Sequence, residues 1–203
     1  YNQGYQTVRD FVCDVKPDVF LLQEHWLTPS NLSKFEHDVV EYICIGSSAM
    51  SAIVESGVLR GRPFGGVMIL VNKKHKKYVR VVCAAERYAV VVVGDLLILN
   101  VYLPCEGTND RISVCDDIFH NLLFWIMKYP THKILIGGDF NANLDAKCTV
   151  SDVILKFIKD VNLRRCDSSS TGARKQFTYF NEGLNCGSYI DYILVSPDVM
   201  TSH

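Results

Sequence analysis

An acid and an amide follow a short apolar stretch near the middle of the chain. Residues 134–136 are apolar and run into Gly137 and Gly138, after which come Asp139 and Asn141. Side chains two positions apart point to the same side of an extended backbone, so this acid and this amide are expected to act together. A carboxylate beside a carboxamide suits a site that binds a metal or a phosphate. The same residue types also favour turns, so a plain turn remains an alternative at this point.

Other apolar stretches also end in, or carry, polar side chains. Residues 19–22 lead into Glu24, and a later stretch ends with Asn100 and Tyr102 just before a proline. Asp191 stands inside an apolar stretch close to the end of the chain. Because a charged side chain is rarely buried without a partner, Asp191 is expected to have one outside its own strand.

The elements that position these residues follow from the spacing of apolar side chains. Apolar residues three and four apart predict helices, and short runs of β-branched residues predict strands. The expected helices cover residues 5–15, 31–36, 110–128 and 150–161. The expected strands cover residues 19–22, 67–71, 78–84, 87–93, 96–102, 133–136, 176–180 and 189–195, and the strands between 78 and 102 form an antiparallel meander with a Gly94-Asp95 turn.

Length and composition indicate one globular domain over residues 1–203. The chain is 48% hydrophobic and 21% charged, with 21 basic and 22 acidic residues and a net charge of −1. No apolar run approaches the roughly 20 residues that span a bilayer, and no signal peptide is recognised, so we expect an intracellular protein with no membrane partner. A net charge near zero means that any contact with nucleic acid must be local. The basic run at residues 73–77 is predicted to be a solvated turn.

The eight cysteines are scattered, with no Cys-x-x-Cys pair. This pattern argues against zinc ribbons and thioredoxin-like chemistry. Reduced, buried thiols of an intracellular protein are expected, although an even number of cysteines also permits disulfides.

Several of these segments resemble, in the same order, the endonuclease/exonuclease/phosphatase superfamily. They are Leu22-Gln23-Glu24, Asn100-Val101-Tyr102-Leu103-Pro104, Gly138-Asp139-Phe140-Asn141 and Ser188-Tyr189-Ile190-Asp191-Tyr192-Ile193. The resemblance implies an α/β (α+β) fold, a four-layer α/β/β/α sandwich of two mixed β-sheets with helices outside. It also implies a metal site where strand ends meet.

Both ends of the chain depart from the family pattern. The family carries an Asn on a strand before its opening helix, and Asn2 stands too close to Glu24 to be a sure equivalent. The family closes with Ser-Asp-His, whereas this chain closes with Thr201-Ser202-His203. The domain is therefore expected to lack its first and last strands, and His203 is expected to be a chance residue.

Within the superfamily, three segments look most like the apurinic-type endonuclease domains of non-LTR retrotransposons. These are Gly61-Arg62-Pro63-Phe64-Gly65-Gly66-Val67, Gln23-Glu24-His25-Trp26-Leu27 and Gly137-Gly138-Asp139-Phe140-Asn141-Ala142-Asn143. The resemblance implies a monomeric nuclease that acts in the nucleus and nicks one strand of double-stranded DNA. The freed 3′-hydroxyl would prime synthesis by a reverse transcriptase domain of the same polyprotein.

Phosphodiester hydrolysis assigns roles to the central residues. Charge on the phosphate oxygens must be stabilised, and hard oxygen ligands suit Mg²⁺, with Mn²⁺ as a possible substitute. Glu24 is the expected metal ligand, and Asp139 is expected to orient and deprotonate the attacking water. Asn141 would donate an amide hydrogen bond to a phosphate oxygen, and Tyr102 would place its hydroxyl on the phosphate or on the leaving oxygen.

Further residues complete the expected site. Thr178 and Asn100 are expected to contact the substrate, although a plain β-strand former and a strand-end residue are the respective alternatives. The resemblance implies that Asp191 orients the His that closes the family pattern. His25 and Trp26 follow the metal carboxylate and are candidates for a DNA contact, with core packing as the alternative for Trp26.

Other functions stay open on sequence grounds. A phosphatase of the same superfamily, acting on inositol phosphates or nucleotides, would share the catalytic residues. A cellular repair endonuclease for abasic sites is closer still, and a decayed, non-catalytic remnant belongs to a different class. Target sequence and strand preference depend on loop geometry and DNA deformability.

Overall fold

The computed structural model describes residues 2–55, 57, 64–166, 177–183 and 185–200, and the chain divides into two compact units, Tyr1–Tyr102 and Leu103–His203. Residues 61–63 of the glycine-rich segment, residue 176 of a predicted strand, and Thr201-Ser202-His203 lie outside the described residues. Among the described residues, no helix has the length and apolar character needed to cross a membrane.

The first unit holds two antiparallel sheets. Its elements are α1 (Asn2–Val15), β1 (Val19–Gln23), α2 (Pro29–Asp38), β2 (Tyr42–Ser47), α3 (Ser51–Glu55), β3 (Val67–Asn72), the 3₁₀ helix η1 (Lys73–Tyr78), β4 (Val79–Ala84), β5 (Tyr88–Val93) and β6 (Leu96–Tyr102). One sheet has the strand order β1-β3-β2. The other contains β4, β5 and β6 as the predicted antiparallel meander.

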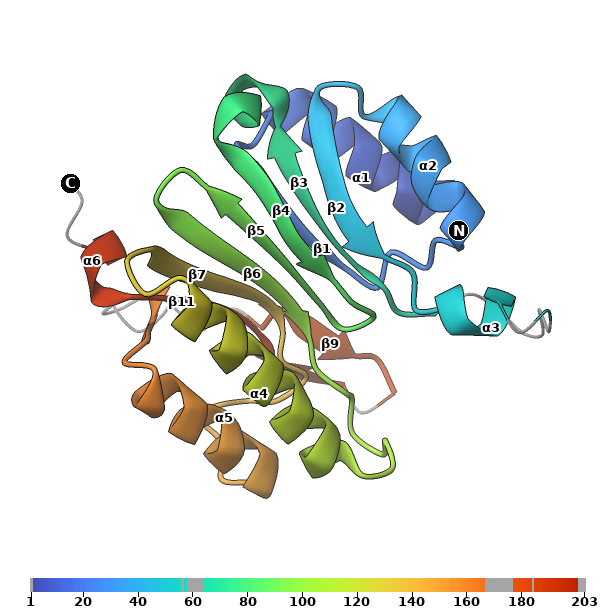
Figure 1. Cartoon of the computed structure of the whole chain (residues 1–203). Coiled ribbons are helices and arrows are strands. Elements are labelled where there is room, and N and C mark those ends of the chain that lie inside the picture. Colours follow the sequence, from blue (N-terminus) through green and yellow to red (C-terminus); the bar gives the residue numbers. More distant parts are fainter. Residues whose placement is uncertain (1, 56, 58–63, 167–176, 184, 201–203) are drawn as a thin grey trace. The chain divides into compact units, whose positions relative to one another are not determined.

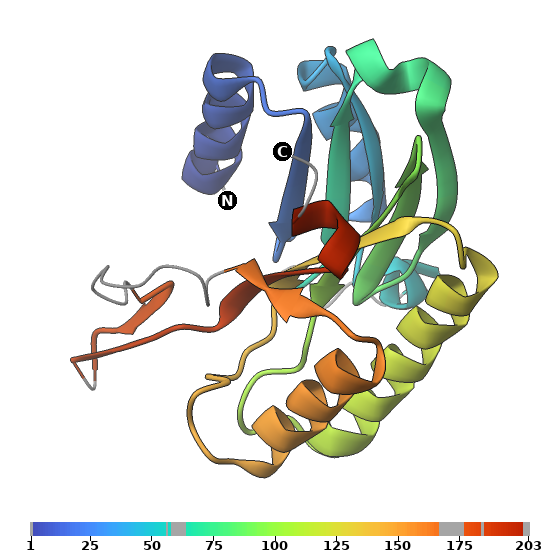
Figure 2. The same cartoon turned by 90° about the vertical axis from the view of Figure 1, so that its left-hand side faces the viewer.

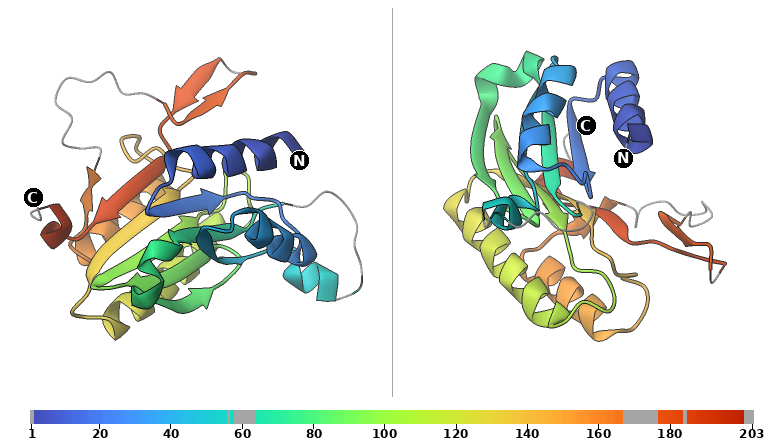
Figure 3. Two further views of the ribbon diagram at one scale, coloured as in Figure 1. Left: turned by 90° about the horizontal axis from the view of Figure 1, so that it is seen from above. Right: turned by 90° about the vertical axis from the view of Figure 1, so that its right-hand side faces the viewer.

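Strand β3 is the centre of the first unit. Met68 and Leu70 pack against α1 and α2 through Val12 and Phe35, while β3 also contacts β5 and β6. Both faces of β3 are therefore covered, which explains its unbroken apolar sequence. Figures 1 and 3 show α1 and α2 over the outer face of the β1-β3-β2 sheet, with α1 lying along β1.

The second unit combines a small sheet, a hairpin and packed helices. Its elements are α4 (Arg111–Lys128), β7 (Lys133–Asp139), α5 (Thr149–Asp160), β8 (Arg164–Arg165), β9 (Tyr179–Asn181), β10 (Cys186–Ser188), β11 (Asp191–Val195) and α6 (Pro197–Met200). Strand β11 pairs antiparallel with β7 on one side and with β8 on the other. Helices α4 and α5 pack through stacked rings of Phe119 and Phe157, whose centroids are 4.5 Å apart. The β9–β10 hairpin extends away from β11 (Figure 2).

Several elements differ from the sequence prediction. Strand β7 continues through Gly137 and Gly138 to Asp139, because β11 pairs with it along this whole length. Asp191 is the first residue of β11 and so lies at the start of the strand, not inside it. The basic run is a 3₁₀ helix tied down by Lys73, which donates to the Val40 carbonyl, and by Lys74, which pairs with Asp18.

All eight cysteines are free thiols, as expected. Their expected burial is wrong for most of them, since the exposed ones are Cys13, Cys105, Cys148, Cys166 and Cys186. An apolar neighbour in sequence does not bury a cysteine, because adjacent residues in a helix or strand point in different directions. Burial is strong at Cys44, where it raises the pKa of the thiol to about 12.

Candidate functional site

In the first unit, Glu24 and Tyr102 are hydrogen-bonded to each other. Glu24 directly follows β1, and Tyr102 is the last residue of β6. The Tyr102 hydroxyl donates to Glu24 Oε1, and the Arg87 guanidinium lies over the Tyr102 ring, 5.4 Å from its centroid. Sequence reasoning selected Glu24 and Tyr102 separately, and the structure brings them together.

The turn that carries Glu24 has an unusual backbone. Glu24 and Trp26 both have a positive φ, 52° and 54°, which is uncommon for residues other than glycine. His25 stands between them with its ring mostly buried. The Leu27 amide donates to His25 Nδ1 at 3.0 Å, so the other nitrogen, Nε2, carries the hydrogen and donates to the Ser47 carbonyl at 3.1 Å. Burial lowers the pKa of His25, which favours this neutral form.

The turn is also held from the segment before β3. The Trp26 amide donates to the Gly65 carbonyl at 3.0 Å. Gly66, with φ +88°, packs so closely that a Cβ there would lie 2.4 Å from His25 Cε1. Only glycine fits at this position, so two of the segments that carry the retrotransposon resemblance contact each other.

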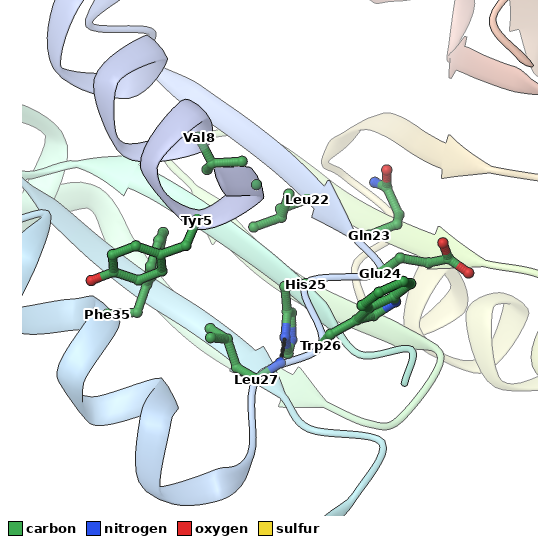
Figure 4. A pocket seen from close by; sticks show the side chains of 10 residues that line it. Tyr5, Val8, Leu22, Gln23, Glu24, His25, Trp26, Leu27 and Phe35 are labelled. Atoms are coloured by element: carbon green, nitrogen blue, oxygen red, sulfur yellow. Dashed lines mark hydrogen bonds between the residues drawn. The ribbon is translucent and has the colours of Figure 1, made fainter. Parts of the chain in front are cut away.

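A pocket of about 460 Å³ lies beside this turn. Helix residues line one part of it, while Glu24 and Trp26 lie at the same end in Figure 4. The full lining is Gly4, Tyr5, Val8, Leu22, Gln23, Glu24, His25, Trp26, Leu27 and Phe35. The pocket therefore has an apolar interior with a carboxylate at one end.

Asn100 has a different place from the substrate contact that the sequence predicts. Its side chain is completely buried, with 0% exposure. Its amide donates to the carbonyls of Leu22 at 3.0 Å and Met68 at 2.9 Å, and its oxygen accepts from Gln23 Nε2. A fully satisfied amide in this position joins β6 to the β1-β3-β2 sheet, which is a structural role.

In the second unit, Asp139 and Asn141 form a closed turn. The Asp139 carboxylate accepts from the Asn141 backbone amide at 2.7 Å and from Asn141 Nδ2 at 3.1 Å. Asn141 Nδ2 also donates to the Leu103 carbonyl at 2.9 Å, and the Leu103 amide donates to the Asp139 carbonyl at 2.9 Å. Both Nδ2 hydrogens of Asn141 thus have acceptors, so a donation to a phosphate oxygen would replace one of these bonds.

Arg111 fixes the same turn from the start of α4. Its guanidinium donates to the Pro104 carbonyl at 2.9 Å and to the Asn141 carbonyl at 2.6 Å. Asn141 has φ +50°, and the arginine holds this strained residue against the segment that follows Leu103. Arg111 therefore positions the acid–amide pair.

Asp191 and Thr178 are neighbours in the second unit. Thr178 Oγ1 accepts from the backbone amides of Ile190 at 3.0 Å and Asp191 at 3.2 Å. Burial raises the pKa of Asp191, and a hydrogen bond with Thr178 partly opposes this. In register, Asp191 is the cross-strand partner of Asp139. The expected histidine partner, His203, lies outside the described residues.

The donors present fit a hard divalent cation. Glu24 is exposed and offers carboxylate oxygens beside a hydroxyl. In the part of the chain that the structure describes, no group of three or more His, Cys, Asp or Glu side chains gathers at one place. The Glu24 carboxylate with its neighbouring hydroxyl fits Mg²⁺, which keeps several waters and needs only one or two carboxylates.

Sequence reasoning missed the roles of His25 and Arg111. His25 was a candidate for a DNA contact, but the structure turns its ring inward onto backbone groups. The signal that could have found Arg111 is its position at the start of an amphipathic helix, shortly after Pro104. Both residues hold a turn that carries an acid.

Comparison with known proteins identifies the relationship. The model of the Endonuclease/Exonuclease/phosphatase family matches residues 1–203 of the chain. No curated protein matches its sequence.

Solved structures with a similar fold include enzymes that act on DNA. A 3′ phosphatase from Neisseria, solved with a product DNA hairpin, is 19% identical with a TM-score of 0.72, and 97% of this chain and 83% of that chain are covered. A 3′-5′ exonuclease from Neisseria meningitidis is 20% identical with a TM-score of 0.68 and the same coverage, 97% and 83%. An AP endonuclease from Archaeoglobus fulgidus is 13% identical with a TM-score of 0.66, covering 96% and 82%. The likeness confirms the predicted α/β class, a mixed fold with two main sheets flanked by helices.

Proposed function

Because the chain belongs to the endonuclease/exonuclease/phosphatase family, we propose that it is a Mg²⁺-dependent endonuclease that nicks one strand of double-stranded DNA. The observation that carries the proposal is a pair of acids at strand ends, each held by a hydrogen-bonding neighbour. Glu24 is held by Tyr102, and Asp139 is held by Asn141. Acids fixed in this way lose little freedom on binding a phosphodiester, which is a condition for efficient catalysis.

Each residue then has a defined task. Asp139 accepts the proton of the attacking water, which forms a bond to phosphorus as the bond to the 3′ oxygen breaks. Tyr102 would give up its hydrogen bond to Glu24 and donate to the phosphate or to the leaving oxygen, while Glu24 would hold the cation. The bound cation supplies charge neutralisation on the phosphate oxygens. Thr178 and Asn141 are proposed to contact the phosphate at the expense of some of their present bonds.

A nucleic-acid substrate is supported by aromatic side chains on and beside the β9–β10 hairpin. Phe177, Tyr179 and Phe180 are exposed, and the Phe177 and Phe180 rings contact each other with centroids 5.2 Å apart. Exposed aromatics can stack on bases, whereas a small phosphate ester offers no such surface. The hairpin therefore favours a substrate that contains bases, such as DNA, over inositol phosphates.

The retrotransposon role is the finer part of the proposal. The contact between the His25 turn and the Gly65-Gly66 segment supports it, because both segments carry the resemblance to these endonucleases. The nick would leave a 3′-hydroxyl that primes a reverse transcriptase domain of the same polyprotein. In this role the domain acts as a monomer, inside the cell and in the nucleus.

Nicking of supercoiled plasmid tests the proposal. The chain should convert supercoiled plasmid to the open circular form with Mg²⁺ or Mn²⁺ and not with EDTA, and Asp139→Asn should remove this activity. An abasic oligonucleotide cut far faster than intact duplex would favour a repair enzyme. Phosphate release from an inositol phosphate without plasmid nicking would favour a phosphatase. A folded chain with none of these activities would support the alternative that the protein is a decayed, non-catalytic remnant.

A further inference from the structure

Trp26 is an exposed indole held in a backbone conformation that few tryptophans adopt. It has φ 54°, and 45% of its surface is exposed. A positive φ in a bulky residue costs free energy, and such strain persists only where the surroundings enforce it. The surroundings here are the His25 ring, bonded at both nitrogens, and the Gly65 carbonyl, which accepts from the Trp26 amide. The backbone that carries the indole is therefore held in place, and the indole itself faces solvent.

The position of Trp26 relative to Glu24 gives the exposed ring a use. Both residues line the same pocket and lie at one end of it, while the His25 ring is bonded to backbone groups (Figure 4). The alternating left-handed residues of the turn place the acid and the indole on the solvent side and the histidine inside. Core packing, the alternative for Trp26, does not explain this arrangement, because almost half of the side chain stays exposed.

We propose that Trp26 is a nucleobase-stacking residue, and that the base it contacts is next to the phosphate whose cation Glu24 would hold. The inference rests on the proposed nuclease function and names a substrate contact within it. A flat indole stacks on any base that is unpaired or displaced from the duplex, so this contact adds affinity without reading sequence. Loss of one base–aromatic stack weakens binding about 5- to 150-fold.

Tryptophan fluorescence tests the contact directly. The chain has two tryptophans, so Trp125→Phe leaves Trp26 as the sole emitter. A duplex oligonucleotide with a single-stranded end is titrated into this variant in EDTA, which prevents cleavage. We expect saturable quenching of Trp26 emission, with the dissociation constant that fluorescence anisotropy gives for a labelled copy of the same oligonucleotide.

Substitutions add a second readout. Trp26→Ala should weaken oligonucleotide binding by at least about fivefold, and Trp26→Phe should retain most of the affinity. Phe124→Ala, which removes an exposed ring on α4, is the matched control and should leave affinity unchanged. Circular dichroism checks that each variant is folded, and the Trp125→Phe titration decides the question if Trp26→Ala does not fold.

The outcomes separate this inference from the proposed function. Oligonucleotide binding by the wild-type chain, without Trp26 quenching and with full affinity in Trp26→Ala, would overturn the stacking role and leave the nuclease proposal intact. No binding of any oligonucleotide by the folded wild-type chain would overturn both.

Discussion

Asp191 lies directly opposite Asp139 across the antiparallel pair of β11 and β7. Residues paired in this way point to the same face of a sheet, and like charges directly opposite each other are unfavourable. Burial raises the pKa of Asp191, which also disfavours its charged form. Asp191 therefore holds its proton to a higher pH in the folded state than in the unfolded chain.

This relationship predicts a pH dependence of stability. A carboxyl with a raised pKa in the folded state contributes stability below its ordinary pKa, and this contribution is lost as pH rises through the raised value. We expect Asp191→Asn to be more stable than wild type at neutral pH, with the difference shrinking as pH falls toward the ordinary aspartate range. Urea denaturation of both proteins from pH 4 to 7 measures the difference. A difference that does not change with pH would contradict the burial of a charged Asp191.

A second prediction concerns the contact between Gly66 and His25. A Cβ on residue 66 would lie 2.4 Å from the ring, whereas Gly94 has a positive φ as well but nothing within 4 Å of such a Cβ. Both alanine variants carry backbone strain, and only Gly66→Ala adds the collision. We expect Gly66→Ala to lower the free energy of unfolding by about 1–3 kcal/mol more than Gly94→Ala, the usual cost of overpacking. Equal losses would show that the His25 ring can move aside.

Asn100 should matter for stability more than for chemistry. Asn100→Ala would leave the carbonyls of Leu22 and Met68 and the Gln23 amide without their present partner. Each buried group left unpaired costs about 1–3 kcal/mol, so a loss of at least about 2 kcal/mol is expected in chemical denaturation. Asn121→Ala on the exposed surface of α4 is the control and should change stability by less than about 0.5 kcal/mol. If Asn100→Ala is instead stable but binds DNA poorly, the result would support the substrate contact that the sequence predicts for Asn100.

The elements were predictable where the pattern was local. The strand at 96–102 matches β6 at both ends, because the Gly94-Asp95 turn and Pro104 bound an aliphatic run. The Gly137-Gly138 pair misled, since glycines favour turns and only the pairing with Ile193 and Tyr192 keeps them in a strand. Strand β2 and helix α3 were not among the expected elements, because the small residues of these segments give no clear periodicity.

The acids of the candidate site could be predicted from the sequence, whereas the residues that hold them in place could not. Glu24, Asp139 and Tyr102 stand at strand ends, which a single sequence reveals. The inward orientation of the His25 ring requires left-handed backbone conformations at Glu24 and Trp26, and the spacing of apolar residues does not predict such conformations. Asn100 and Tyr102 share a face of β6, yet one is buried and the other bonds the exposed Glu24, because their distance from the strand end decides which group each one meets.

The metal assignment gives a further prediction. Glu24→Gln should weaken Mg²⁺ binding by at least about tenfold. Substitution of residues that only hydrogen-bond to metal ligands already lowers metal affinity about 10- to 100-fold, and Glu24 is the proposed ligand itself. Glu41→Gln is the matched control, because Glu41 is exposed and precedes β2 at the end of the sheet opposite to Glu24. Calorimetric titration of the three proteins measures the affinities. Identical values for wild type and Glu24→Gln would place the cation elsewhere.

The central claim is that Glu24 and Asp139 serve one reaction, and a double-mutant cycle in plasmid nicking tests it most directly. Glu24→Gln and Asp139→Asn are measured singly and together under saturating Mg²⁺, with circular dichroism as the check of folding. Each single change is expected to slow nicking about 10²- to 10⁴-fold. Groups that act as a unit are not additive, so the double variant should be only as slow as the slower single variant. A double variant slowed by the product of the two single effects, or wild-type nicking in either single variant, would contradict the account.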